Sequence, residues 1–120
     1  LFYLYYSVST FGSNTSTIGL ATSRTLAPNS WRDNGIVLAS GRENFYNAID
    51  PAVLHTPDKR LYMAFGSFWG GIHLVELDST TGKQRKPGTP PVVIAAHRDK
   101  RPNAIEAPYL HFRNGWYYLF

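Results

Sequence analysis

The 120-residue sequence contains no cysteine, which excludes a disulfide framework and any metal site built on thiolates. It has no apolar run near the ~20 residues of a membrane-spanning helix, so we expect no membrane partner. No stretch repeats its apolar residues every 3.6 positions, so amphipathic helices are not expected. Hydrophobic residues make up 43% and charged residues only 17%, a balance typical of a globular rather than a disordered chain.

Short β-type runs, separated by turn residues such as Pro, Gly, Asn and Asp, fill most of the sequence. Many of these runs are rich in Tyr, Phe and Val, which favour strands. The runs predict an all-β fold with strands at 2–8, 17–23, 36–39, 51–55, 61–65, 72–77, 92–95, 108–112 and 116–120.

One nine-residue stretch occurs twice, as NAIDPAVLH at 47–55 and as NAIEAPYLH at 103–111. Each copy is followed by a tight turn and a second apolar strand, and the opening LFYLYY resembles that second strand. A β-rich unit recurring at roughly 55–60 residues indicates a propeller with four-stranded blades. The chain has the strands of about two blades, divided among three, whereas a propeller needs at least four. We therefore expect it to be a fragment of a longer protein.

The propeller topology assigns the two acids of the repeat to one place. The first strand of a blade lines the central channel, so its start lies on the same rim as the loop between the second and third strands. Asp50 and Glu106 each open a first strand, and we expect both at the channel mouth. The loop at 67–71 lies on that rim. The basic segments 83–86 and 97–101 contribute to a net charge of +4. We interpret them as solvated loops and expect no nucleic-acid partner.

Two carboxylates at one channel mouth suggest acid–base chemistry. A single acid at a blade start is more often a turn-fixing residue, but like charges in a narrow channel raise each other's pKa. Glycoside hydrolysis needs such a pair, with one carboxyl protonated and one ionised. Phe68 and Trp69 on the same rim offer apolar faces that suit sugar rings, although packing between blades would also explain them.

Four segments, YYSVSTFGSNTSTIGLATS, NAIDP, FGSFWGGI and IEAPYL, resemble the five-bladed propeller enzymes of glycoside hydrolase family 43, and most of all its endo-1,5-α-L-arabinanases. The resemblance covers essentially all 120 residues. It implies an inverting mechanism with three acids: an Asp base, a second Asp that orients and tunes the pKa, and a Glu general acid. Asp50 in AIDP matches the second Asp, and Glu106 in IEAPY matches the general acid. The base belongs to an earlier blade, outside this chain.

The resemblance further implies a single catalytic propeller domain of which residues 1–120 are part, with the flanking blades missing. We expect a secreted protein, monomeric when complete, that hydrolyses internal α-1,5 links of arabinan or arabino-oligosaccharides. No cofactor is required and no metal ligand is assigned; a structural ion in the channel of the complete protein fits the resemblance. The isolated chain is expected to be inactive because it lacks the base. The residues expected to border the sugars are Asn47, Ser67, Phe68, Trp69 and Gly70.

Three alternatives remain open from the sequence. The same acids would serve an exo-acting α-L-arabinofuranosidase or β-xylosidase. A non-catalytic sugar-binding propeller would keep the rim aromatics but would not need the base. A basic nucleic-acid module is the least favoured, because 83–86 falls on the rim opposite the acids.

Overall fold

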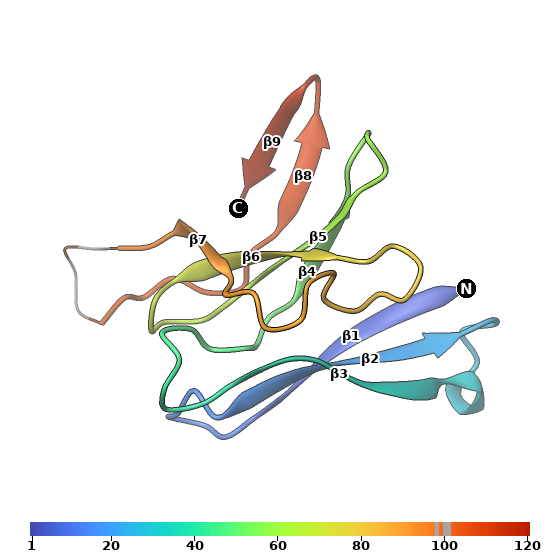
Figure 1. The fold of residues 1–120 in the computed structure, drawn as a ribbon, viewed down its shortest axis with the longest axis horizontal. Helices are drawn as coiled ribbons and strands as arrows, with labels where there is room; N and C mark the ends of the chain where they lie inside the picture. The colour runs from blue at the N-terminus through green and yellow to red at the C-terminus, as the bar shows by residue number, and fades with distance from the viewer. Residues whose placement is uncertain (98, 100–101) are drawn as a thin grey trace.

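The computed structural model describes residues 1–97, 99 and 102–120, which form nine strands and one short 3-10 helix (Figure 1). All nine predicted strands are present, which confirms the all-β prediction. Within the described residues, no helix has the length and apolar character needed to cross a bilayer. The elements are β1 (Phe2–Ser9), β2 (Ser16–Ser23), η1 (Pro28–Ser30), β3 (Arg32–Ser40), β4 (Ala52–His55), β5 (Leu61–Phe65), β6 (Ile72–Leu77), β7 (Val92–Ala95), β8 (Leu110–Arg113) and β9 (Trp116–Leu119).

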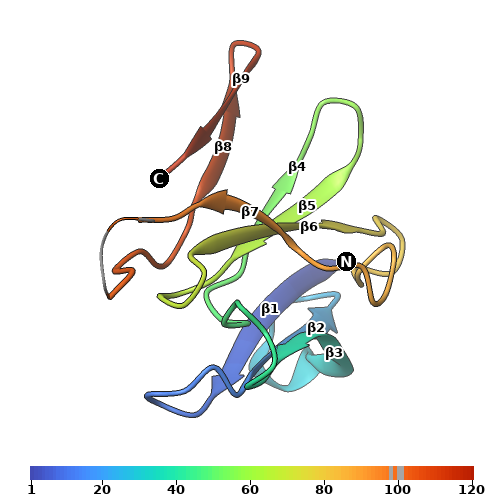
Figure 2. The same ribbon diagram turned by 60° about the vertical axis from the view of Figure 1, so that its left-hand side comes forward.

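The strands form three antiparallel sheets, each a meander of consecutive strands. Their orders are β1-β2-β3, β4-β5-β6-β7 and β8-β9. The middle sheet has the four strands of a complete blade, and the repeat predicts this arrangement. The sheets follow one another through the molecule, as Figure 2 shows, and β4 of the second sheet contacts β8 of the third.

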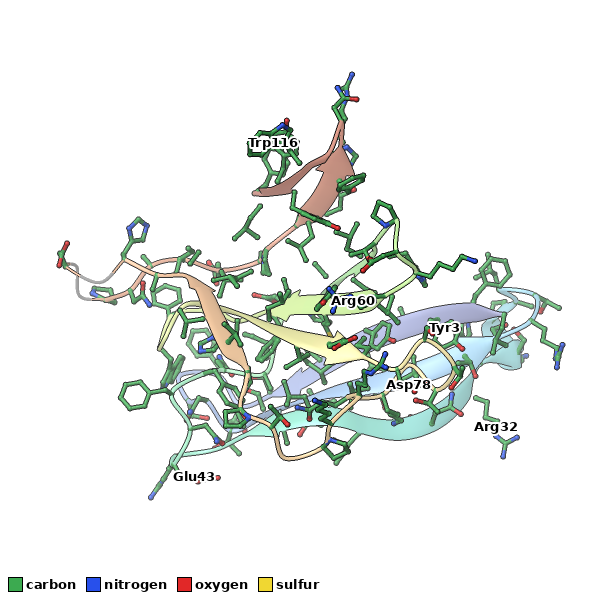
Figure 3. All side chains as sticks on the ribbon, turned by 45° about the horizontal axis from the view of Figure 1, so that its top comes forward. Tyr3, Arg32, Glu43, Arg60, Asp78 and Trp116 are labelled. Carbon is green, nitrogen blue, oxygen red and sulfur yellow. The ribbon has the colours of Figure 1, made fainter. Side chains whose placement is uncertain are left out.

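The hydrophobic core lies between the first two sheets. Ile18 on β2 packs with Met63 and Phe65 on β5, and all three side chains are fully buried. In contrast, the third sheet leaves its aromatic residues open. Trp116, shown on the β8–β9 hairpin in Figure 3, is 71% exposed. Burying apolar surface is the main favourable term in folding, so the interface between the first two sheets holds this part of the molecule together.

The loop at 67–71 and the segments before β4 and β8, which were predicted to share a rim, lie on one side of the molecule, at the left of Figure 1, together with the loop before β2. Backbone contacts agree with the picture. The N–H of Phe68, in the loop after β5, donates to the carbonyl of Ile105, in the segment before β8, at 2.9 Å. The rim therefore joins the second sheet to the third.

The basic segment 83–86 follows β6 on the other rim, as predicted, but Lys83 is not the solvated loop charge that the sequence suggested. Its Nζ donates to the three backbone carbonyls of residues 34–36 on β3, at 2.6, 2.7 and 2.8 Å. Arg85 pairs with Glu76 at 3.3 Å. Lys83 thus ties the second sheet to the first. Much of the other basic segment, 97–101, lies outside the described residues.

The ends of several strands differ from the prediction for local reasons. β3 begins at Arg32 rather than at 36, although the residues RDNG have poor strand propensity. Two hydrogen bonds stabilise this stretch in the sheet: Lys83 donates to the carbonyl of Asn34, and the Asn34 side chain donates to the Thr22 hydroxyl on β2. β4 begins at Ala52, one residue after Pro51. Proline has no N–H to give to a sheet, so strand pairing begins after it.

Candidate active site

Glu106 is positioned by the loop of the preceding blade. Ser67, just after β5, forms an isolated antiparallel bridge with Glu106, and the Ser67 hydroxyl donates to Glu106 Oε2 at 2.9 Å. The neighbouring hydrogen bond from Phe68 N–H to Ile105 O fixes the same two segments side by side. Ser67 is buried, whereas Glu106 is exposed. The carboxyl group of Glu106 is therefore held at a defined place while it stays open to a ligand.

Asp50 connects all three sheets. Its N–H donates to the hydroxyl of Ser7 on β1 at 3.2 Å, and its Oδ2 accepts from the N–H of Ala107 at 3.3 Å. Burial raises the pKa of the Asp50 carboxyl. The Ala107 N–H opposes this shift, and the nearby charge of Glu106 adds to it. Because Ala107 follows Glu106 directly, this hydrogen bond fixes the Asp50 carboxylate to the backbone next to the second acid.

Two backbone conformations at these acids are unusual. Asp50 has φ of 56° and Ala107 has φ of 51°, both in the left-handed region that residues other than glycine rarely adopt. Asp50 stands directly before Pro51, and Ala107 stands directly before Pro108. Both residues lie ahead of the strand that follows, β4 or β8. Such strain persists only when surrounding contacts hold it, and it concentrates at functional sites. The Asp50–Ala107 hydrogen bond is one contact that holds it here.

The predicted sugar-contact residues Ser67, Phe68, Trp69 and Gly70 form one tight loop between β5 and β6. Phe68 and Trp69 have φ of 53° and 32°, and the turn closes with a hydrogen bond from Gly71 N–H to Phe68 O at 2.7 Å. Phe68 is half-buried, and Trp69 is 38% exposed. The loop thus presents aromatic surface beside Glu106.

Asn47 differs from the rest of the predicted set because its side chain is only 3% exposed. Its Oδ1 accepts a hydrogen bond from the Ser16 hydroxyl at 2.6 Å. The structure places it beneath the rim, where it connects β2 to the segment that leads to Asp50. Its place in the hydrogen-bond network is that of a support for the rim.

Asn103, which the sequence reasoning missed, supports the rim in the same way. Its Nδ2 donates to Trp69 O at 2.9 Å, and its Oδ1 accepts from His97 N–H at 2.7 Å. The signal was present in the repeat, since Asn47 and Asn103 open its two copies.

The other acids near the first sheet have different surroundings. Asp33 accepts from the Tyr6 hydroxyl and from Gly35 N–H, both at 2.9 Å, and the Gly35 N–H is the main cause of its lowered pKa. Glu43 lies in the exposed loop after β3, at the edge of the molecule (Figure 3). No group of three or more His, Asp and Glu side chains with metal-binding geometry occurs in the part of the chain that the structure describes.

The blade repeat and the three successive antiparallel sheets define the chain as part of a propeller. Residues 1–120 match the sequence profile of the glycosyl hydrolases family 43, and the chain belongs to this family. The predicted five-bladed propeller architecture is confirmed by the solved structures that the chain resembles.

Three relatives illustrate the likeness. The extracellular endo-α-(1→5)-L-arabinanase 1 of Bacillus subtilis is 48% identical over 118 residues, which are 98% of this chain and 35% of that protein. The extracellular exo-α-(1→5)-L-arabinofuranosidase ArbA of Cellvibrio japonicus is 40% identical over 132 residues, covering 100% of this chain and 38% of that protein. The solved family 43 endo-arabinanase of Bacillus licheniformis superimposes with a TM-score of 0.90 at 43% identity, over 98% of this chain and 39% of that one. The chain thus spans little more than a third of its curated relatives.

Proposed function

We propose that the complete protein containing this chain hydrolyses internal α-1,5-L-arabinofuranosidic links in arabinan. The observation that carries the proposal is the pair of acids held across neighbouring blades, with Asp50 bonded to Ala107 and Glu106 bonded to Ser67 beside the Phe68–Trp69 loop. The names of the Bacillus subtilis and Bacillus licheniformis relatives support arabinan as the substrate.

In this mechanism, the protonated carboxyl of Glu106 donates its proton to the glycosidic oxygen as the bond to the sugar breaks. Protonation is needed because an alkoxide is a poor leaving group. Water attacks from the opposite face of the sugar, activated by a carboxylate base that the family resemblance assigns to an earlier blade. A separation of about 6.5–9.5 Å between acid and base leaves room for this water.

The family resemblance makes Asp50 the acid that tunes and orients the general acid. Its hydrogen bond to Ala107 N–H fixes the backbone next to Glu106. Ser67 then orients Glu106, and Phe68 with Trp69 provides the faces against which the sugar rings pack.

Residues 1–120 form part of one catalytic propeller domain in this proposal. The complete protein is secreted, in keeping with relatives that are named extracellular, and it acts as a monomer without a nucleic-acid partner. A structural ion in its channel remains part of the proposal, and the described residues are not assigned as its ligands.

Product analysis on linear arabinan tests the proposal and separates endo from exo cleavage. We expect the complete protein to release a mixture of oligosaccharides at the earliest times, because internal links are cut at random. The exo alternative is favoured by the name of the Cellvibrio japonicus relative. A single product released from the chain end from the first time point would establish the exo alternative, and no cleavage at all would leave only a sugar-binding propeller.

A further inference from the structure

A pocket of about 340 Å³ lies on the same rim as the two acids but is not lined by either of them. Its lining includes residues of the loops before β4, before β6 and after β7, so it sits over the outer strands of the middle sheet. The lining residues that matter here are Phe45, Trp69, Gly70, His73, His97 and Asn103. Trp69 and Gly70 are among the residues expected to border the sugars, whereas Phe45, His73 and His97 have no role assigned so far.

His73 supplies a hydrogen-bond acceptor at the base of the pocket. The residue is 2% exposed, and its Nδ1 lies 2.9 Å from the carbonyl of Gly71. A carbonyl can only accept, so Nδ1 carries the proton and Nε2 of the neutral ring has a lone pair. Burial lowers the pKa of His73, which keeps the ring neutral at pH 7.

That lone pair has no hydrogen-bond partner among the described residues. Among the described residues, no fully buried side-chain nitrogen or oxygen is without a hydrogen-bond partner, so His73 Nε2 is not enclosed in the core. His73 is one of the residues that line the pocket. A polar atom that is this nearly buried normally has a partner, and a ligand in the pocket would provide one.

Gly70 brings the pocket walls together. A Cβ on Gly70 would lie 2.3 Å from the Phe45 carbonyl oxygen and 3.1 Å from His73 Cε1, so only glycine allows this approach. The close contact places the backbone of Phe45 beside the His73 ring. The Phe45 side chain is 85% exposed, and that of Trp69 is 38% exposed. Two open aromatic side chains therefore flank a buried acceptor.

The chemistry of the described lining suits a ligand with hydroxyl groups. Among the described lining residues, none is Asp, Glu, Lys or Arg. The amide of Asn103 is already used by Trp69 and His97. What is left is the acceptor of His73, the exposed imidazole of His97 and two aromatic faces for C–H groups, and a sugar ring with its hydroxyls satisfies this combination.

We propose that this pocket is an accessory site that holds one further sugar residue of the polysaccharide, outside the pair of acids. A hydroxyl of that sugar donates to His73 Nε2, and its ring lies against Phe45 and Trp69. The inference rests on the proposed arabinan substrate and adds a contact that only longer chains can make.

Calorimetric titration of linear arabino-oligosaccharides of increasing length tests the site. The complete protein carries Glu106→Gln throughout, so that no substrate is consumed. His73→Phe keeps the aromatic packing but removes the acceptor, and it is expected to weaken the binding of long oligomers about 2–10-fold, the effect of one hydrogen bond. Phe45→Ala should weaken the same oligomers about 3–10-fold through lost ring contact. Neither variant should change the Kd of the disaccharide.

Phe11→Ala is the matched control, because Phe11 is a fully exposed aromatic residue on the same rim that does not line the pocket. If His73→Phe does not fold, Phe45→Ala still decides, since its exposed side chain can be removed without affecting the core. Unchanged affinity in both variants at every length would overturn the site. So would an equal loss for the disaccharide, or for Phe11→Ala. A length-dependent loss in a protein that cleaves no arabinan in its unsubstituted form would support the pocket while contradicting the proposed hydrolysis.

Discussion

Replacing Glu106 with glutamine in the complete enzyme lowers the rate of arabinan hydrolysis by about 10²–10⁴-fold, the usual effect of losing a general acid. Glutamine has nearly the same shape and can still accept the hydrogen bond that the Ser67 hydroxyl donates. It cannot donate a carboxylic proton to the leaving oxygen. An aryl arabinoside whose leaving group needs no protonation should therefore recover most of the lost rate.

Asp50→Asn is the matched comparison for this experiment. It also slows hydrolysis, but the aryl substrate should not selectively rescue it, because Asp50 acts by charge and by holding Ala107 rather than by donating the proton. The ratio of kcat/KM on the two substrates measures the difference directly. Equal rescue of the two variants would mean that the roles of Asp50 and Glu106 are misassigned.

Replacing Gly71 with alanine should destabilise the rim loop strongly. Gly71 has φ of 91°, and an added Cβ would lie 2.2 Å from Ala95 O and 2.9 Å from Ala96 Cβ. Strain and overpacking together predict a loss of about 2–4 kcal/mol in the free energy of unfolding. Because the Gly71 N–H also closes the turn at Phe68, kcat/KM on arabinan should fall with it.

Gly12→Ala provides the control for this loop variant. Gly12 has a similar backbone conformation, with φ of 76°, but an added Cβ would meet nothing within 4 Å. It should cost only the backbone penalty of about 1–2 kcal/mol. Denaturant unfolding of both variants of the complete enzyme measures the difference. An equal loss at the two positions would show that the close approach of Ala95 is not what requires glycine.

The nine strands and their grouping into blades could be predicted because both signals are local. Apolar runs between turn residues define each strand, and the repeat of NAI followed by an acid defines the blade. The same repeat placed Asp50 and Glu106 on one rim, and the contacts through Ala107 and Ser67 bring them together.

The finer structure of the site could not be predicted, because it depends on contacts between residues far apart in the sequence. Nothing in the order APY indicates that Ala107 adopts a left-handed conformation, which the Asp50 carboxylate helps to hold. Lys83 sits in an ordinary turn sequence, yet it binds three carbonyls of another sheet. The acceptor role of His73 could not be predicted either, because it depends on the pocket that Gly70 and Phe45 form beside the ring.

The stereochemistry of the first product tests the central claim, that Glu106 and Asp50 serve an inverting glycosidase. The anomeric proton of the newly formed reducing end can be followed by NMR while the complete enzyme cleaves linear arabinan, before mutarotation mixes the two forms. A single displacement by water at an α-link predicts that the β-anomer forms first. Appearance of the α-anomer first would indicate a covalent intermediate and a retaining mechanism, and would contradict the assignment of these acids.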